Sequence, residues 1–174
     1  MDKDFLELDN LPIFFTFPRF MRYVTLVIGF MLLVFSFYVV FTQINGDSST
    51  FKKILPFIIM FLAADSLFRN LFSLNKVSIY KDKVVFSYIA KKKLIVNWRK
   101  INKLETYQGK GKFFVLYYYD NVNSKEIKKY YIPMAYNNIL EIVNYIVYLS
   151  NDIQTDDFVK SLIYLKPNIE GKND

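Results

Sequence analysis

The chain has 174 residues, of which 53% are hydrophobic and 22% are charged, and its formal net charge is +7. It contains no cysteine and no histidine. These absences exclude disulfides, a cysteine nucleophile, a cysteine-ligated metal and the usual general base at neutral pH. The mean hydropathy is +0.15 despite the many charges, because apolar residues are concentrated before residue 75.

The segment before the first long apolar run is acidic and then aromatic. Its first ten residues include four acidic side chains, which is unlike the basic start of a signal peptide. The stretch Leu11–Phe20 is rich in phenylalanine and contains two prolines. We therefore expect residues 1–22 to be an N-terminal interfacial segment that lies on a membrane before the first helix begins.

Two apolar stretches predict a transmembrane helical hairpin over residues 23–74. Residues 23–42 carry no charge and, as a helix, span about 30 Å, the thickness of a hydrocarbon core. Residues 54–74 contain Asp65 and Arg69, whose i,i+4 spacing places both on one helix face. This intramembrane pair is either an ionisable site for ions or partner helices, or a self-neutralising pair near the helix end, which is the simpler interpretation.

The distribution of basic residues predicts how the hairpin is oriented. Arg19 and Arg22 precede the first span, and several lysines follow the second, whereas the loop between the spans offers only Lys52 and Lys53. The positive-inside rule then places both termini in the cytoplasm, as in a multi-pass protein of the inner (cytoplasmic) membrane.

From residue 75 the pattern changes to short alternating runs separated by turns, which predicts a β domain over residues 75–150. The expected strands are Val77–Tyr80, Val84–Ile89, Leu94–Trp98, Lys103–Tyr107, Phe113–Tyr119 and Glu126–Ile132. Trp98 continues an inward alternation, so we expect it in the core. The glycine-containing stretch Gln108–Lys112 lacks the spacing of a phosphate-binding loop, and we expect a hairpin turn.

An amphipathic helix is predicted to close the domain. Asn138 is a candidate N-cap with Glu141 three residues later, an arrangement typical of a capping box. Apolar residues recur at helical spacing up to Leu149. Residues 151–174 are expected to form a short amphipathic helix from Thr155, followed by a disordered tail beyond Pro167.

Taken together, these patterns resemble the bacterial pleckstrin-homology-like (PH-like) membrane proteins, in particular the YcxB-like group. The resemblance rests on the two-helix anchor, on Val77–Tyr80, on Val96–Ile101 and on Ile132-Pro133 before the helix. It implies a membrane α hairpin plus an α+β domain, namely a PH-like antiparallel β-sandwich or barrel with a C-terminal capping helix on the cytoplasmic face. The helix after residue 150 departs from that pattern.

Positive charge is concentrated in residues 76–131, which carry fourteen basic and four acidic side chains. The resemblance implies that a basic rim binds phosphorylated headgroups. The candidates for this role are Lys91, Lys92, Lys93, Arg99, Lys100 and Lys103. We expect attraction to anionic lipid that is not specific for one headgroup, and the alternative is an ordinary solvated surface.

A second candidate surface is apolar and aromatic. Tyrosines alternate along the strands, so half of them face outward if one side of the sheet is wet. The residues expected to offer a partner surface are Tyr118, Tyr130, Phe158 and Leu162. Ordinary sheet packing is the alternative.

Two functions are compatible with these features, and catalysis is not expected, because no spacing brings a second reactive group beside Asp65 or Glu105. The first function is a membrane-anchored adaptor or accessory subunit whose domain binds a protein partner, or a second copy of itself. The alternative is an anionic-lipid-sensing or transport-related protein that uses the basic rim and the Asp65–Arg69 pair. We expect no cofactor, no metal and no nucleic-acid partner, and we identify no small-molecule substrate.

Overall fold

The computed structural model describes residues 10–163, apart from residues 47, 108, 110 and 121–125. The expected tail beyond Pro167 therefore lies outside the described residues, as do residues 1–9 of the expected N-terminal segment and most of the turn before the last expected strand. The chain divides into two compact units. The helical unit contains Phe17–Asn75 and Tyr88–Lys92, and the β unit contains the described parts of Met1–Thr16, Lys76–Ser87 and Lys93–Asp174.

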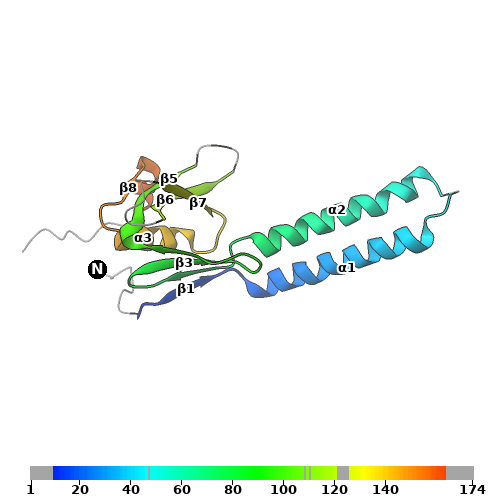
Figure 1. Cartoon of the computed structure of the whole chain (residues 1–174), viewed down its shortest axis with the longest axis horizontal. Helices are drawn as coiled ribbons and strands as arrows, with labels where there is room; N and C mark the ends of the chain where they lie inside the picture. The colour runs from blue at the N-terminus through cyan, green and yellow to red at the C-terminus, as the bar shows by residue number, and fades with distance from the viewer. Residues whose placement is uncertain (1–9, 47, 108, 110, 121–125, 164–174) are drawn as a thin grey trace, which may run out of the picture. The chain divides into compact units, whose positions relative to one another are not determined.

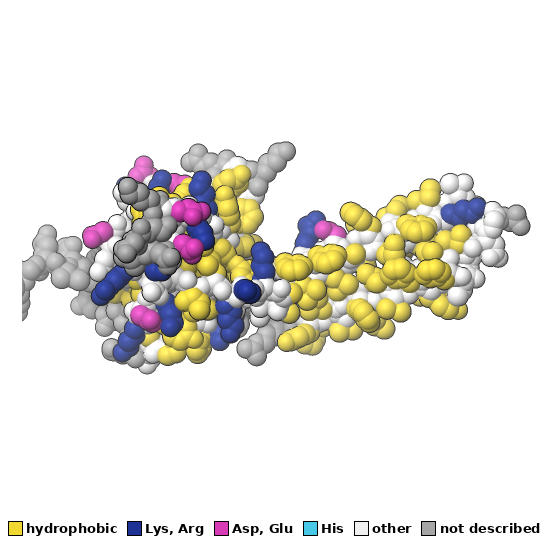
Figure 2. Space-filling model, viewed as in Figure 1, with side chains coloured by type: hydrophobic (Ala, Val, Ile, Leu, Met, Phe, Trp, Pro, Cys, Tyr) yellow, Lys and Arg dark blue, Asp and Glu magenta, His cyan; other side chains and the backbone are white. Residues whose placement is uncertain are grey.

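The helical unit is a pair of long apolar helices, α1 (Arg19–Gln43) and α2 (Thr50–Phe72). They run side by side in Figure 1, and Figure 2 shows hydrophobic side chains over most of their visible surface. Mean hydropathy reaches 2.6 in Arg22–Gln43 and 1.6 in Thr50–Phe72, and only 11% of each hydrophobic window is buried. Both helices are thus long and apolar enough to cross a membrane, and they contain the predicted spans 23–42 and most of 54–74.

The two helices meet through small or polar residues. In α1 the buried positions Arg22, Gly29 and Ser36 recur every seven residues, and in α2 Pro56 and Ala63 have the same spacing. A Cβ added at Gly29 would lie 3.1 Å from the Leu67 side chain, so a larger residue here would press on Leu67. Small residues at seven-residue intervals are typical of antiparallel helices packed closely within a bilayer.

Sheet A contains a strand that the sequence analysis missed. Its order is β1-β2-β3-β4, all antiparallel, with β1 (Ile13–Thr16), β2 (Lys76–Ile79), β3 (Lys83–Ser87) and β4 (Leu94–Asn97). In β1, Phe15 is opposite Val77, and Figure 1 shows the blue β1 beside the green strands. Within Leu11–Phe20, which the sequence predicts to lie on a membrane surface, Ile13–Thr16 is thus a paired strand of the β unit. The helical hairpin is inserted between the first and second strands of the sheet rather than preceding the domain.

Sheet B has the order β7-β6-β5-β8. It is formed by β5 (Ile101–Thr106), β6 (Phe113–Tyr119), β7 (Ile127–Pro133) and the short β8 (Gln154–Thr155), which pairs parallel to β5. The β5–β6 connection contains Gly111 at φ +120°, a conformation that favours glycine. The predicted turn in this stretch is confirmed at its described residues, because the Tyr107 N–H donates to the Phe113 carbonyl at 2.8 Å.

Helices α3 (Ile139–Leu149) and α4 (Asp157–Leu162) complete the β unit. The buried side of α3 includes Ile142, Val143 and Ile146, all fully covered. Asn138 occupies the N-cap position, as expected, but it is left-handed (φ 55°) and makes no side-chain cap. Its amide instead donates to the Glu141 carboxylate at 3.1 Å, so the expected capping box is absent.

The cap of α4 ties the end of the chain to sheet B. The Asp156 carboxylate accepts the N–H groups of Val159 at 2.7 Å and of Thr106 at 2.6 Å. Burial works against ionisation of this carboxyl, but the hydrogen bonds and the nearby Lys103 charge together outweigh it, and the pKa of Asp156 lies below its usual value. The described fold is thus two long apolar helices together with two sheets and C-terminal helices.

Candidate functional site

One face of sheet B is turned away from the core and is unusually apolar. Along β6, Phe114, Leu116 and Tyr118 are buried against the core. The residues between them point to the other side, where Val115 is also buried and Phe113, Tyr117 and Tyr119 are partly exposed. We call that side the outer face of sheet B. It comprises Lys103, Glu105, Tyr107, Phe113, Val115, Tyr117, Tyr119, Ile127, Lys129 and Tyr131.

Three aromatic rings form a cluster on this outer face. Tyr107 lies edge-on to Phe113 at 6.3 Å and to Tyr131 at 5.8 Å between ring centroids, and Phe113 lies edge-on to Tyr131 at 6.1 Å. Tyr131 remains 46% exposed. A wet sheet face usually carries polar side chains, so this cluster has the composition of an interaction surface.

A charged network lies beside the cluster. The Tyr117 hydroxyl donates to Glu105, which also pairs with Lys103. The hydrogen bond to Glu105 raises the pKa of Tyr117 to about 12, and the bonds from Lys103 and Tyr117 hold the pKa of Glu105 below its usual value. The ammonium of Lys129 lies 5.2 Å from the centroid of the Tyr117 ring. These contacts hold the polar groups in place around the aromatic cluster.

The predicted partner residues have different outcomes. Tyr118 is buried, so its expected exposure is wrong; Tyr130 packs its ring 4.4 Å from that of Phe86 and is only partly exposed. The outward residues of these strands are instead Tyr117 and Tyr131. In α4, Phe158 is 50% exposed, whereas Leu162 is partly covered.

The predicted basic rim is divided among three places. Lys91 and Lys92 belong to the helical unit, where the neighbouring Ala90 N–H donates to the Leu71 carbonyl at the end of α2. Arg99 follows β4, and Lys93 precedes it, so this four-residue strand separates them by about 13 Å.

The other two basic candidates already have local contacts. Lys100 donates to the Asp120 carbonyl at 2.6 Å, and Lys103 pairs with Glu105 on the outer face of sheet B. Within the β unit, the basic candidates therefore do not gather in a single cluster.

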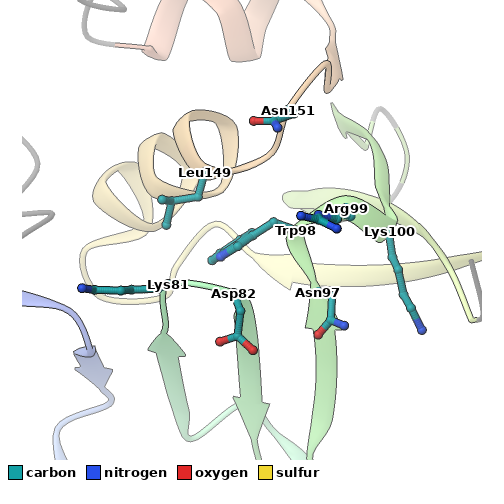
Figure 3. Close-up of a pocket in the computed structure, with 8 residues that line it drawn as sticks. All are labelled: Lys81, Asp82, Asn97, Trp98, Arg99, Lys100, Leu149 and Asn151. Carbon is teal, nitrogen blue, oxygen red and sulfur yellow. The ribbon is translucent and has the colours of Figure 1, made fainter.

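A hollow of about 530 Å³ lies beside Trp98 in the β unit. Trp98 is buried, as predicted, and its indole N–H donates to the Tyr80 carbonyl at 3.0 Å. Figure 3 shows the Lys81 and Lys100 side chains pointing in opposite directions from the hollow. These two ammonium groups therefore do not converge on a common phosphate position.

The Asp65–Arg69 pair is formed, with 2.8 Å between Oδ2 and Nη2, and both side chains are substantially exposed. Arg69 lies in the last turn of α2, where a cation also interacts favourably with the helix dipole. This geometry matches a self-neutralising pair near the helix end.

Arg22 has a structural role that the sequence analysis did not identify. Its side chain is only 3% exposed and donates to the carbonyls of Asn70 (2.5 Å), Ser73 (3.1 Å) and Leu74 (3.4 Å). It also donates to the side chain of Asn75 at 2.8 Å. An arginine of one helix thus satisfies the last carbonyls of the other, which have no intrahelical partner. The position of Arg22 beside an apolar span was the only available signal.

The scan against known protein families gives no matching family, and the search of curated proteins gives no significant match. Among the described residues, no group of three or more acidic side chains is arranged to bind a metal ion.

Proposed function

We propose that the chain is a non-catalytic membrane adaptor or accessory subunit whose β unit binds a protein partner through the outer face of sheet B. The observation that carries the proposal is the Tyr107–Phe113–Tyr131 cluster, an aromatic surface where a soluble domain normally presents polar groups. Tyrosine-rich patches contribute strongly to binding at protein interfaces.

A PH-like classification of the β unit belongs to this proposal. It is supported by seven strands in two antiparallel arrays, followed by the helix α3. The hairpin between β1 and β2 would anchor such a domain to the inner membrane. Arg22, Lys91 and Lys92 belong to the helical unit, and the basic residues at the other end of the hairpin are Lys52 and Lys53 in the first turn of α2. This distribution supports cytoplasmic termini.

The test is a pull-down of the tagged full-length chain from native membranes in mild detergent, with stoichiometry determined by mass spectrometry. The variant Tyr107→Ala/Tyr131→Ala removes the exposed rings without touching the core. Ile95→Ala, an exposed apolar residue on β4, is the matched control. We expect the double variant to lose a stoichiometric partner that the control retains. Identical co-purifying proteins in all three samples would reject the outer face as the partner site.

A second candidate function, attraction to anionic lipid, is supported by Lys91 and Lys92 beside the end of α2. All three lysines of Lys91–Lys93 are exposed, and each close lysine contributes about 1 kcal/mol of attraction to an anionic surface. In liposomes reconstituted with the full chain, Lys91→Gln/Lys92→Gln/Lys93→Gln should reduce the enrichment of labelled anionic lipid around the protein, most clearly at low salt. Enrichment that depends on neither salt nor these lysines would exclude this role.

A further inference from the structure

Strand β7 is the open edge of sheet B. It has seven residues and pairs only with β6, whereas the opposite edge of the sheet is covered by β8. The edge strands of sheet A, β1 and β4, have four residues each. Within the described residues, β7 therefore presents the longest row of backbone N–H and C=O groups that have no neighbouring strand.

This edge lacks the usual protection against pairing. Its register with β6 continues without a shift over seven pairs, and its single proline stands at the last position, Pro133. Edge lysines normally oppose pairing through their charge. Here Lys128 is paired with Asp120 at 2.6 Å, and Lys129 lies over the Tyr117 ring. Both cations are thus engaged within the same chain.

The side chains of β7 are also exposed for a strand of a folded domain. Only Ile132 is buried, and Ile127 and Tyr131 are each more than two-fifths exposed. Both belong to the outer face of sheet B, so a strand added beside β7 would extend the apolar surface as well as the hydrogen-bonded ladder.

We propose that a second copy of this chain pairs antiparallel along β7, joining two B sheets into one continuous sheet. The side-chain pattern of the strand is compatible with this occupant. A two-fold axis at Tyr130 places Lys129 opposite Tyr131 of the second copy, and Lys128 opposite Ile132. Registers centred on Lys128 or Lys129 place lysine opposite lysine, which is destabilising. The strand is therefore complementary to itself in the register that keeps the lysines apart, as an isologous interface requires.

The inference does not depend on the proposed adaptor function. Pairing along β7 joins the two outer faces side by side and leaves the aromatic clusters accessible. A dimer without a protein partner, or a partner bound to a monomer, would separate the two proposals.

The absence of native cysteine permits a direct test of the register by disulfide crosslinking. Two differently tagged full-length chains, one with Lys129→Cys and one with Tyr131→Cys, are co-expressed, and their membranes are oxidised with copper phenanthroline. Directly opposite residues are close enough for a disulfide, so we expect about tenfold more crosslinked dimer from the mixture than from Lys129→Cys alone. Ile95→Cys, on the exposed edge of sheet A, controls for random collision.

Three results would overturn the proposal. In the first, every combination of β7 cysteine variants crosslinks no more than the Ile95→Cys control, and the cysteine-free chain has the mass of a monomer in mild detergent. The second is a different protein that co-purifies in stoichiometric amount and crosslinks to Lys129→Cys or Tyr131→Cys while the mixed β7 product falls to the level of the Ile95→Cys control, because a foreign strand would then occupy the edge. Strong crosslinking of Tyr131→Cys with itself, without the mixed product, would also reject the register centred on Tyr130.

Discussion

The helical unit and the β unit place apolar and polar residues in opposite ways. In the helical unit the residues covered by packing include Arg22, Ser36 and Ala63, and large apolar side chains such as Phe61 point outward. In the β unit the covered residues are large and apolar, and Figure 2 shows most of the visible lysines and arginines on this unit's surface.

The difference indicates that the two units are adapted to different solvents. Burial of large apolar groups stabilises a domain in water, whereas lipid removes that driving force and leaves close packing and hydrogen bonds to hold helices together. Outward phenylalanines and an inward arginine are costly in water and favourable in a bilayer. The two units therefore support the proposed membrane anchor more strongly than hydropathy alone.

The largest expected effect contrasts a core residue of one unit with an outward residue of the other. Leu116 is fully buried in β6, so Leu116→Ala should lower the free energy of unfolding of the β unit by about 3 kcal/mol. Phe61 in α2 is 72% exposed, and Phe61→Ala should change stability in detergent by less than about 0.5 kcal/mol. Thermal unfolding of both variants in the same detergent measures the contrast. Equal losses of stability in the two variants would contradict the inference that the β unit is adapted to water and the helical unit to lipid.

The inward arginine gives the next largest effect. Arg22→Ala leaves several carbonyls at the end of α2 without their donor, and we expect a loss of about 2 to 3 kcal/mol. Arg22→Lys should recover only part of the loss, because an ammonium cannot reproduce the planar set of guanidinium donors. Helical circular dichroism during heating in detergent measures both. Full stability of Arg22→Ala would show that these carbonyls find other donors.

A smaller effect, restricted to the β unit, is expected at Asp156. Asp156→Ala removes the α4 cap and should cost about 1 kcal/mol at neutral pH. Because the folded-state pKa is lowered, the contribution of Asp156 is complete above the unfolded pKa and is lost as the pH falls through the folded pKa. Urea unfolding from neutral to acidic pH should therefore show the native chain and the variant converging in acid. A difference in unfolding free energy that stays constant across that pH range would show that ionisation of the Asp156 carboxylate is not the cause of the stabilisation.

The smallest effect concerns the exposed ion pair of α2. Replacing both partners, in Asp65→Asn/Arg69→Gln, should change thermal stability in detergent by less than about 1 kcal/mol, because removing the two paired charges together leaves neither one uncompensated. Conductance or solute uptake in reconstituted vesicles should stay unchanged if the pair only neutralises itself. A change in transport with normal stability would support an ionisable site instead.

Parts of the fold that depend on local pattern were predictable. Twenty uncharged residues predict a long apolar helix wherever the rest of the chain lies, and the alternation around Trp98 predicts that it is buried. The orientation of the tyrosines was not predictable to the same degree. Shifting the in–out alternation by one residue would turn Tyr118 outward in place of Tyr117, and Tyr130 outward in place of Tyr131. Which set faces outward depends on which side of β6 packs on the core.

The sequence by itself determined the two long apolar helices, the absence of thiol and imidazole chemistry, and the β character of residues 76–133, because each depends on composition or short-range periodicity. Only the tertiary structure decided that Ile13–Thr16 joins sheet A, that Arg22 binds the end of α2, and that Tyr107, Phe113 and Tyr131 form one surface. The physical reason is distance along the chain. Phe15 meets Val77 and Arg22 meets Asn70 across the whole helical hairpin, and no local pattern encodes a partner so far away.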